Sequence, residues 1–221
     1  MREDFDFSNF AREVKQTATA LLTDKPSDDE LIQTCRVVQE MAETALVRHR
    51  SNASRIACGR GCSHCCVVNV SVLQPEATTI VDYLERKHDG NRLLALKRKI
   101  DELHAAIQWL DDEERIRWKQ PCALLDDSGS CSVYPVRPLL CRGLTSTDAE
   151  TCRQAIELIS LADAPSITVN LFQSFLYNQA FISLAQAMES TGIDSRSMEM
   201  TAALKRILDE RHGGADRLRD D

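Results

Sequence analysis

The chain has 221 residues and a formal net charge of −7, and 43% of its residues are hydrophobic. This composition is typical of a globular protein and excludes a disordered chain. The negative charge would repel a phosphate backbone, and no basic stripe offsets it, so we expect no nucleic-acid partner. No apolar run reaches the roughly 18 residues that cross a bilayer, so we also expect no membrane association.

The first seven residues carry acidic and aromatic side chains where a secretory signal would place a basic patch and then an apolar stretch. We therefore expect a cytoplasmic protein. Nine cysteines are many for a chain of this length. In a reducing cytosol such thiols are more often metal ligands or catalytic groups than disulfides, so they become the main evidence on function.

Two amphipathic helices are predicted within residues 8–50. The second should begin at Ser27, because Ser27 followed by Glu30 forms a capping box. Cys35 falls on the apolar face of this helix, so we expect it to be a core residue and not a ligand. The apolar face of the first helix would consist of Phe10, Val14, Ala18 and Leu21.

Helical periodicity fails over residues 51–73, which are rich in glycine and cysteine. Alternation of Val68, Val70 and Val72 predicts a short extended segment at the end of this stretch. Pro75 suits the first turn of a helix that runs to about Lys87. A further long helix follows over residues 93–110.

A β-hairpin is predicted between Pro121 and Cys141. Its two arms, residues 122–125 and 131–134, flank an Asp-Asp-Ser-Gly turn. The acidic residues 111–114 that precede it are interpreted as a solvated charge run.

Three more helices are predicted towards the C-terminus. Thr147 and Glu150 form a second capping-box match, which predicts a helix running to about Ala162. Residues 166–190 are apolar nearly all round, as expected of a buried central helix. The last helix is predicted over 194–212.

Four thiols lie close together in the glycine-rich loop, at Cys58, Cys62, Cys65 and Cys66. Intervening glycines give the backbone freedom to wrap these thiols around one ion or cluster. Adjacent reduced cysteines have little packing purpose and oxidise readily, so we expect metal binding. His64 within the loop is an alternative ligand.

A second set of thiols consists of Cys122, Cys131, Cys141 and Cys152. The predicted hairpin would bring the first two together, and the prolines that follow would return Cys141 towards them. Eight thiols would suit two four-cysteine sites. They would equally suit one site that uses part of each set, with the remainder serving redox chemistry or a labile metal.

Positive charge lies beside the predicted ligands. Four thiolates around Zn²⁺, or around an oxidised 4Fe–4S cluster, leave a net charge of about −2. Such a centre favours nearby cations. Arg60, Arg137 and Arg142 are expected to supply them.

This arrangement resembles the YkgJ-type cysteine-cluster family of zinc- or iron-chelating proteins with a CxxCxxCC-like signature. The matching residues are the CxxxCxxCC run at 58–66 and the segments 121–126, 129–134 and 137–142. The resemblance covers about residues 55–145 and implies metal binding. Cys152 lies outside the common pattern.

The identity of the metal stays open between a 4Fe–4S cluster, Zn²⁺ and mononuclear iron. Structural zinc sites usually combine closely spaced cysteine pairs, whereas the second set is widely spaced, which favours iron–sulfur. Three functions fit: a cluster-bearing redox or modifying enzyme, a structural zinc or interaction module, and a metal carrier or sensor. A protein partner or protein substrate stays open as well.

The predicted fold is mainly α-helical, a single domain over residues 1–221. Cysteine-rich loops and the short β-hairpin would form a metal site within about residues 55–152. Flanking helices would occupy 8–50 and 166–212. Trp109 and Trp118 are expected to pack near the cysteine loops.

Overall fold

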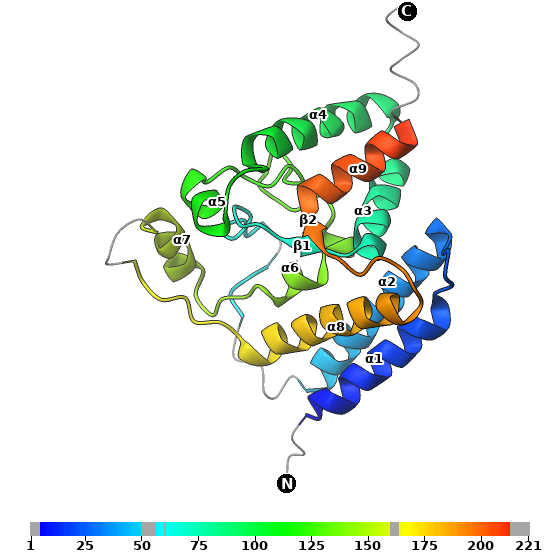
Figure 1. Ribbon diagram of the computed structural model, residues 1–221. Helices are drawn as coiled ribbons and strands as arrows, with labels where there is room; N and C mark the ends of the chain where they lie inside the picture. The colour runs from blue at the N-terminus through cyan, green and yellow to red at the C-terminus, as the bar shows by residue number, and fades with distance from the viewer. Residues whose placement is uncertain (1–4, 50–55, 60, 160–163, 213–221) are drawn as a thin grey trace, which may run out of the picture.

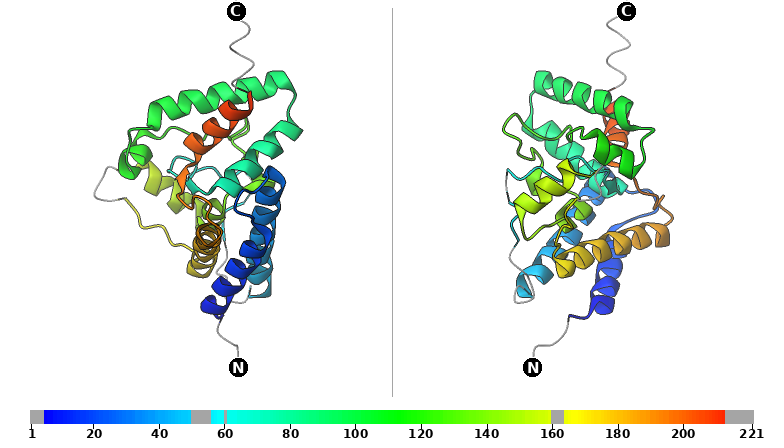
Figure 2. Two further views of the ribbon diagram at one scale, coloured as in Figure 1. Left: turned by 45° about the vertical axis from the view of Figure 1, so that its right-hand side comes forward. Right: turned by 90° about the vertical axis from the view of Figure 1, so that its left-hand side faces the viewer.

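The computed structural model describes residues 5–49, 56–59, 61–159 and 164–212. Two groups of helices lie one above the other in the view of Figure 1, and the cysteine-bearing loops run beside and between them. Figure 2 shows the same separation from two further directions. The mainly helical prediction is confirmed.

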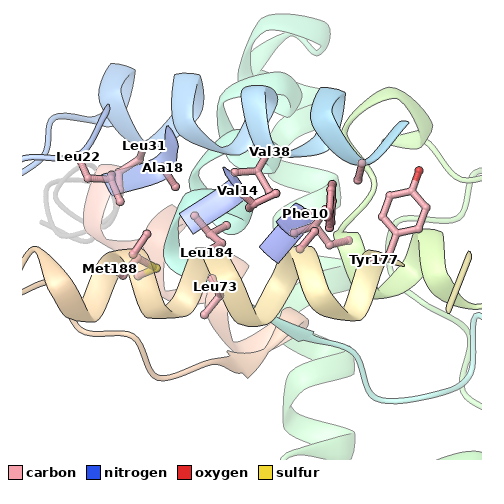
Figure 3. Close-up of a cluster of buried hydrophobic side chains, with 14 of the residues drawn as sticks. Phe10, Val14, Ala18, Leu22, Leu31, Val38, Leu73, Tyr177, Leu184 and Met188 are labelled. Atoms are coloured by element: carbon pink, nitrogen blue, oxygen red, sulfur yellow. The ribbon is translucent and has the colours of Figure 1, made fainter. Parts of the chain in front are cut away.

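The lower group consists of α1 (Phe7–Leu21), α2 (Asp28–Arg48) and α8 (Leu171–Ser190). The capping box predicted at Ser27 is present at the start of α2. Side chains of these helices interlock in one apolar core, into which the fully buried Leu184 projects from α8 (Figure 3). Leu22 joins this core and Leu21 is only half-buried, because the chain turns out of the helix at Leu22.

The upper group consists of α3 (Gln74–Lys87), α4 (Gly90–Ile107) and α9 (Met200–His212). Their apolar faces form a second core, which includes Ile80, Leu84 and Leu204. Partly buried side chains of Cys122, Cys131 and Cys141 pack against it. The second core therefore supports the loops that carry these thiols.

Short elements connect the two groups. Strand β1 (Ser71–Val72) pairs antiparallel with β2 (Met198–Glu199). The remaining elements are α5 (Asp112–Trp118), the 3₁₀ turn η2 (Tyr134–Val136), α6 (Leu139–Gly143) and α7 (Ala149–Glu157).

Several predicted helix boundaries are wrong. Helix α4 spans Gly90–Ile107 and not 93–110, because Asp89 caps it. Helix α8 begins at Leu171 and not at 166, because Asn170 caps it.

The last helix begins at Met200 and not at 194, because Met198 and Glu199 are extended and pair with β1. The cap of α7 is Asp148, whose carboxylate accepts hydrogen bonds from two backbone N–H groups, and not Thr147. This helix ends at Glu157, and the predicted end at Ala162 lies outside the described residues.

One further prediction is corrected. The hairpin over 122–134 is reduced to a single bridge between Leu125 and Cys131. The acidic run at 111–114 is solvent-exposed, as predicted, and it also starts a helix, because Asp111 and Glu114 form a capping box. The acidic composition of this segment did not by itself indicate that a helix begins there.

Exposed apolar side chains contradict the predicted burial of the central helix. Helix α8 is not buried all round, because Leu171 and Phe175 are 63% and 60% exposed. Trp109 is 86% exposed. Trp118 is half-exposed and lines a surface pocket with Cys122 and Gly129, so it lies beside the second cysteine segment, as predicted. Across the described ranges, we find no helix with the length and apolarity required to cross a membrane.

Candidate metal centre

The first cysteine loop is a succession of tight turns. The Cys62 N–H donates to the Gly59 carbonyl at 3.1 Å, and the Cys66 N–H donates to the Ser63 carbonyl at 2.9 Å. A third turn ends where the Val68 N–H reaches the carbonyl of Cys65 at 3.3 Å. Winding of this kind keeps the thiols of one short segment close together.

The second cysteine segment is attached directly to the first. The Cys122 N–H donates to the Cys66 carbonyl at 2.7 Å. Gly61 and Gly129 both have positive φ, of 91° and 74°. These glycines lie where the two loops meet, so a side chain at either would strain the backbone of the site.

Six of the eight predicted thiols line one cavity of about 50 Å³. They are Cys62, Cys65, Cys66, Cys122, Cys131 and Cys141. Three come from the first loop and three from the second set, so the cavity brings together residues far apart in sequence. Among its described lining residues Arg137 carries the only charged side chain. The donor set is therefore sulfur, with no carboxylate, and fits metals that prefer thiolates.

The thiols surround this space without converging on one point. Within the described ranges, no three side chains of histidine, cysteine, aspartate or glutamate are positioned to hold a metal ion as they stand. Holding a single ion would therefore require side-chain rotation.

Cys58 and Cys152 lie outside the lining of the cavity. The sulfur of Cys58 accepts a hydrogen bond from the Ser146 N–H at 3.1 Å. Burial, followed by the nearby Cys65, Cys58 and Cys62 thiols, raises the pKa of Cys152 to about 11. These two thiols therefore lie on the side of the first loop that faces α7.

Cys35 is 1% exposed within α2 and does not line the cavity. Burial raises the pKa of its thiol to about 12. Its burial in a helix agrees with the core position predicted from periodicity.

The thiols of Cys65 and Cys66 form an unequal pair. A hydrogen bond from Cys66 stabilises the Cys65 thiolate and lowers the pKa of Cys65 to about 6. The same interaction, followed by burial, raises the pKa of Cys66. At Cys122 burial is the largest effect, and it raises the pKa to about 11. Of these three thiols, Cys65 therefore loses its proton most readily.

Arg137 is the cation of the cavity. Burial lowers its pKa, but the thiols of Cys141, Cys131 and Cys65 outweigh this and the net shift is upward. Its guanidinium donates to the Cys141 carbonyl at 2.6 Å. Arg137 is thus fixed beside three of the thiols.

The other predicted cations lie further away. Arg142 points towards α2, where it pairs with Glu43, and it also donates to the carbonyls of Arg137 and Pro135. It does not line the cavity and supports the backbone of Arg137 instead. Arg60 lies outside the described residues.

His64 does not line the cavity either. The pKa of the exposed Glu150 is lowered to about 2, mainly by hydrogen bonds from Arg153 and Gln154 and in small part by His64. His64 therefore lies on the α7 side of the loop.

Arg115 is a functional candidate that the sequence reasoning missed. It is 2% exposed, and its guanidinium donates to the Gln120 carbonyl at 2.5 Å. None of the ion pairs in the described part of the chain includes Arg115. Burial lowers its pKa, whereas the nearby Glu199 and Cys122 raise it. The capping box at Asp111 was the available signal, since it would have placed Arg115 on a helix leading to Cys122.

Comparison with known proteins gives one result. Neither a search of curated proteins nor a search of solved structures found a match. Residues 57–157 match the family model CxxCxxCC, described as “Putative zinc- or iron-chelating domain”. This segment contains all eight predicted thiols, and the match confirms the resemblance to the cysteine-cluster family.

Proposed function

We propose that this chain holds a metal centre through its thiolates, in the cavity between the two cysteine-bearing segments. The observation that carries the proposal is the lining of that cavity by six thiols beside the Arg137 guanidinium. The ligands would be drawn from Cys62, Cys65, Cys66, Cys122, Cys131 and Cys141. Cys58 and Cys152 would serve as outer thiols.

Charge balance supports this assignment. A four-thiolate centre would carry a net charge of about −2. Arg137 lines the cavity and Arg115 is buried near Cys122 without an ion-pair partner among the described residues. Glu199 lies near Arg115 but makes no ion pair with it among the described residues, so an anionic centre would add to the compensation of this buried charge.

An iron–sulfur cluster is the favoured occupant. Zinc needs four sulfurs about 2.3 Å from one point, whereas a cluster bonds its thiolates to separate irons and so accepts sulfurs that lie further apart. Six thiols from two separate segments line the cavity. The wide sequence spacing of Cys122, Cys131 and Cys141 is unlike the close cysteine pairs of structural zinc sites. A 4Fe–4S cluster would support an electron-transfer role.

A structural zinc site is the second candidate. Cys141 belongs to α6, which packs against α8 of the lower group, while Cys122 and Cys131 pack against the upper core. Zinc would then fasten the loops that connect the two groups.

Both candidates require reduced thiols, and we therefore propose that the protein acts in the cytosol.

Anaerobic purification followed by elemental analysis, sulfide assay and a visible spectrum distinguishes the two candidates. Iron with acid-labile sulfide and visible absorbance is expected for the cluster. Near-stoichiometric zinc in a colourless protein would exclude it and support the structural site. A protein that takes up neither zinc nor iron after reconstitution would contradict both.

A further inference from the structure

A groove of about 520 Å³ opens beside the thiol cavity. Residues 68–71 form one wall, and α8 forms the opposite wall. Helices α5 and α6 contribute the remaining sides. We call this feature the β1 groove, because the edge of strand β1 lies along it.

The α8 wall of the β1 groove is apolar and exposed. Leu171 and Phe175 are 63% and 60% exposed, and Leu144 beside them is 41% exposed. A helix whose core side is already buried gains nothing from further apolar residues on its outer face. Clustered exposed apolar side chains of this kind are typical of a surface that binds a partner.

The opposite wall offers unused backbone hydrogen-bonding groups. Val72 pairs with Met198, and the Met200 N–H donates to the Val70 carbonyl at 2.8 Å. Backbone groups alternate in direction along an antiparallel pair, so the N–H and C=O of the intervening Ser71 point away from β2. Ser71 is exposed and lines the groove, and outside the β1–β2 ladder it makes no backbone hydrogen bond with any described residue.

One charge marks the end of the groove near α5. Asp112 is exposed and is the only charged side chain among the described lining residues. It accepts a hydrogen bond from the Asn69 amide at 3.0 Å, but it has no ion-pair partner in the described part of the chain. A cation on the partner would complement it.

We propose that the β1 groove binds an extended segment of another polypeptide, which adds to the edge of β1 as a third strand. The free N–H and C=O of Ser71 recognise the backbone of that segment. Apolar side chains of the segment pack on Leu171 and Phe175, and a basic residue faces Asp112.

A segment bound here would lie against the metal centre proposed above. Val68, Val70 and Leu144 line both the groove and the thiol cavity. The groove therefore presents a polypeptide next to the thiols. This inference stands on the surface alone and does not depend on which metal the thiols hold.

Defined synthetic peptides test the proposal with the full-length protein. The probe is a fluorescein-labelled peptide of about six residues that alternates valine and threonine and carries one lysine. Fluorescence anisotropy should show saturable binding below about 1 mM. A peptide with glutamate in place of lysine should bind more weakly, and one N-methylated at alternate amides should not bind. No saturable binding, or equal binding by the N-methylated peptide, would overturn the proposal.

Paired variants locate the binding site. Phe175→Glu should weaken binding about tenfold or more, whereas Ile182→Glu should not, because Ile182 is exposed on α8 outside the groove. Ser71→Pro removes the N–H that faces the groove without touching the bonds to β2, and it should abolish binding. Ser71→Ala keeps that N–H and should bind normally.

Two further measurements keep these variants interpretable. Circular dichroism and metal content should be unchanged in all four variants. Weaker peptide binding can then be assigned to the groove and not to a loss of folding or of the metal centre. Hydrogen exchange at the Ser71 amide should slow at least tenfold when the peptide binds, because that N–H becomes hydrogen-bonded. Unchanged exchange at Ser71 in saturated protein, or full binding by Phe175→Glu, would refute strand addition in this groove.

Discussion

The carboxylate of Glu76 joins two helices, since its Oε1 accepts a hydrogen bond from the Leu139 N–H at 2.8 Å. Its Oε2 accepts from the Leu73 N–H at 2.9 Å, so one side chain completes the first turns of α3 and α6. Glu76 is 1% exposed. Because α6 carries Cys141, this carboxylate also sets the position of a thiol that lines the cavity.

Replacing Glu76 by alanine should destabilise the protein by about 3 kcal/mol. Both backbone N–H groups would be left buried and without an acceptor, and each such loss costs about 1–3 kcal/mol. Urea denaturation measures the change in the free energy of unfolding. Glu40→Ala is the control, because Glu40 is exposed on α2, and its effect should stay within about 0.5 kcal/mol.

Stability should also depend on pH through Glu76. Burial raises the pKa of this carboxyl from 4.5 to about 7, although the two N–H groups oppose the shift. The folded state therefore holds the proton more tightly than the unfolded state does. The contribution of Glu76 to stability should be full below about pH 4.5 and fall as the pH rises to about 7.

Glu76→Gln isolates this dependence, because glutamine does not titrate. The free energy of unfolding of the wild type, relative to that of the variant, should decrease from pH 4.5 to about pH 7 and level off above that. Urea denaturation at a series of pH values makes the comparison. A wild-type advantage that grows as the pH rises would contradict the assignment.

Arg115→Met should weaken metal binding about tenfold, the usual lower limit for the loss of a residue that supports the ligands. The variant removes both the buried cation near Cys122 and the donor to the Gln120 carbonyl. Titration with Co²⁺, followed by the thiolate-to-cobalt absorption band, measures the affinity. Arg117→Met is the control, because Arg117 is exposed and pairs only with Glu113 among the described residues. Equal affinities in the two variants would exclude a role for Arg115 in the centre.

Cysteine variants should differ according to their place relative to the cavity. Cys122→Ala and Cys141→Ala should abolish metal retention, because both thiols line the cavity. Cys58→Ala and Cys152→Ala should reduce it less, because neither thiol does. Metal content, measured after gel filtration in a buffer that contains a chelator, ranks the four variants by metal retention. Complete loss in Cys152→Ala with retention in Cys141→Ala would place the centre on the α7 side instead.

Cys35→Ala should leave metal content unchanged and lower stability by about 1 kcal/mol. The thiol is buried in α2 away from the cavity, so its removal leaves a small void without touching a ligand. Urea denaturation and elemental analysis are the measurements. Loss of metal from this variant would mean that Cys35 belongs to the centre.

Apolar periodicity correctly predicted the long helices, because each repeats one side of a core at helical spacing. Ser27 and Glu30 correctly predicted the start of α2, because they form its capping box. Elements whose conformation depends on a distant partner were not predictable in this way. Met198 and Glu199 are extended because they pair with β1, and nothing in their local sequence indicates that partner.

The expectation of a thiol-based metal site came from the sequence by itself. The cysteine run at 58–66, together with the segments 121–126, 129–134 and 137–142, indicated the resemblance to a zinc- or iron-chelating family, and residues 57–157 match the model of that family. Only the tertiary structure decided which thiols meet. Six of them share one cavity, while Cys58 and Cys152 lie beside it. Folding also buried Arg115 next to Cys122. Long-range packing brings such groups together, and local sequence does not encode those distances.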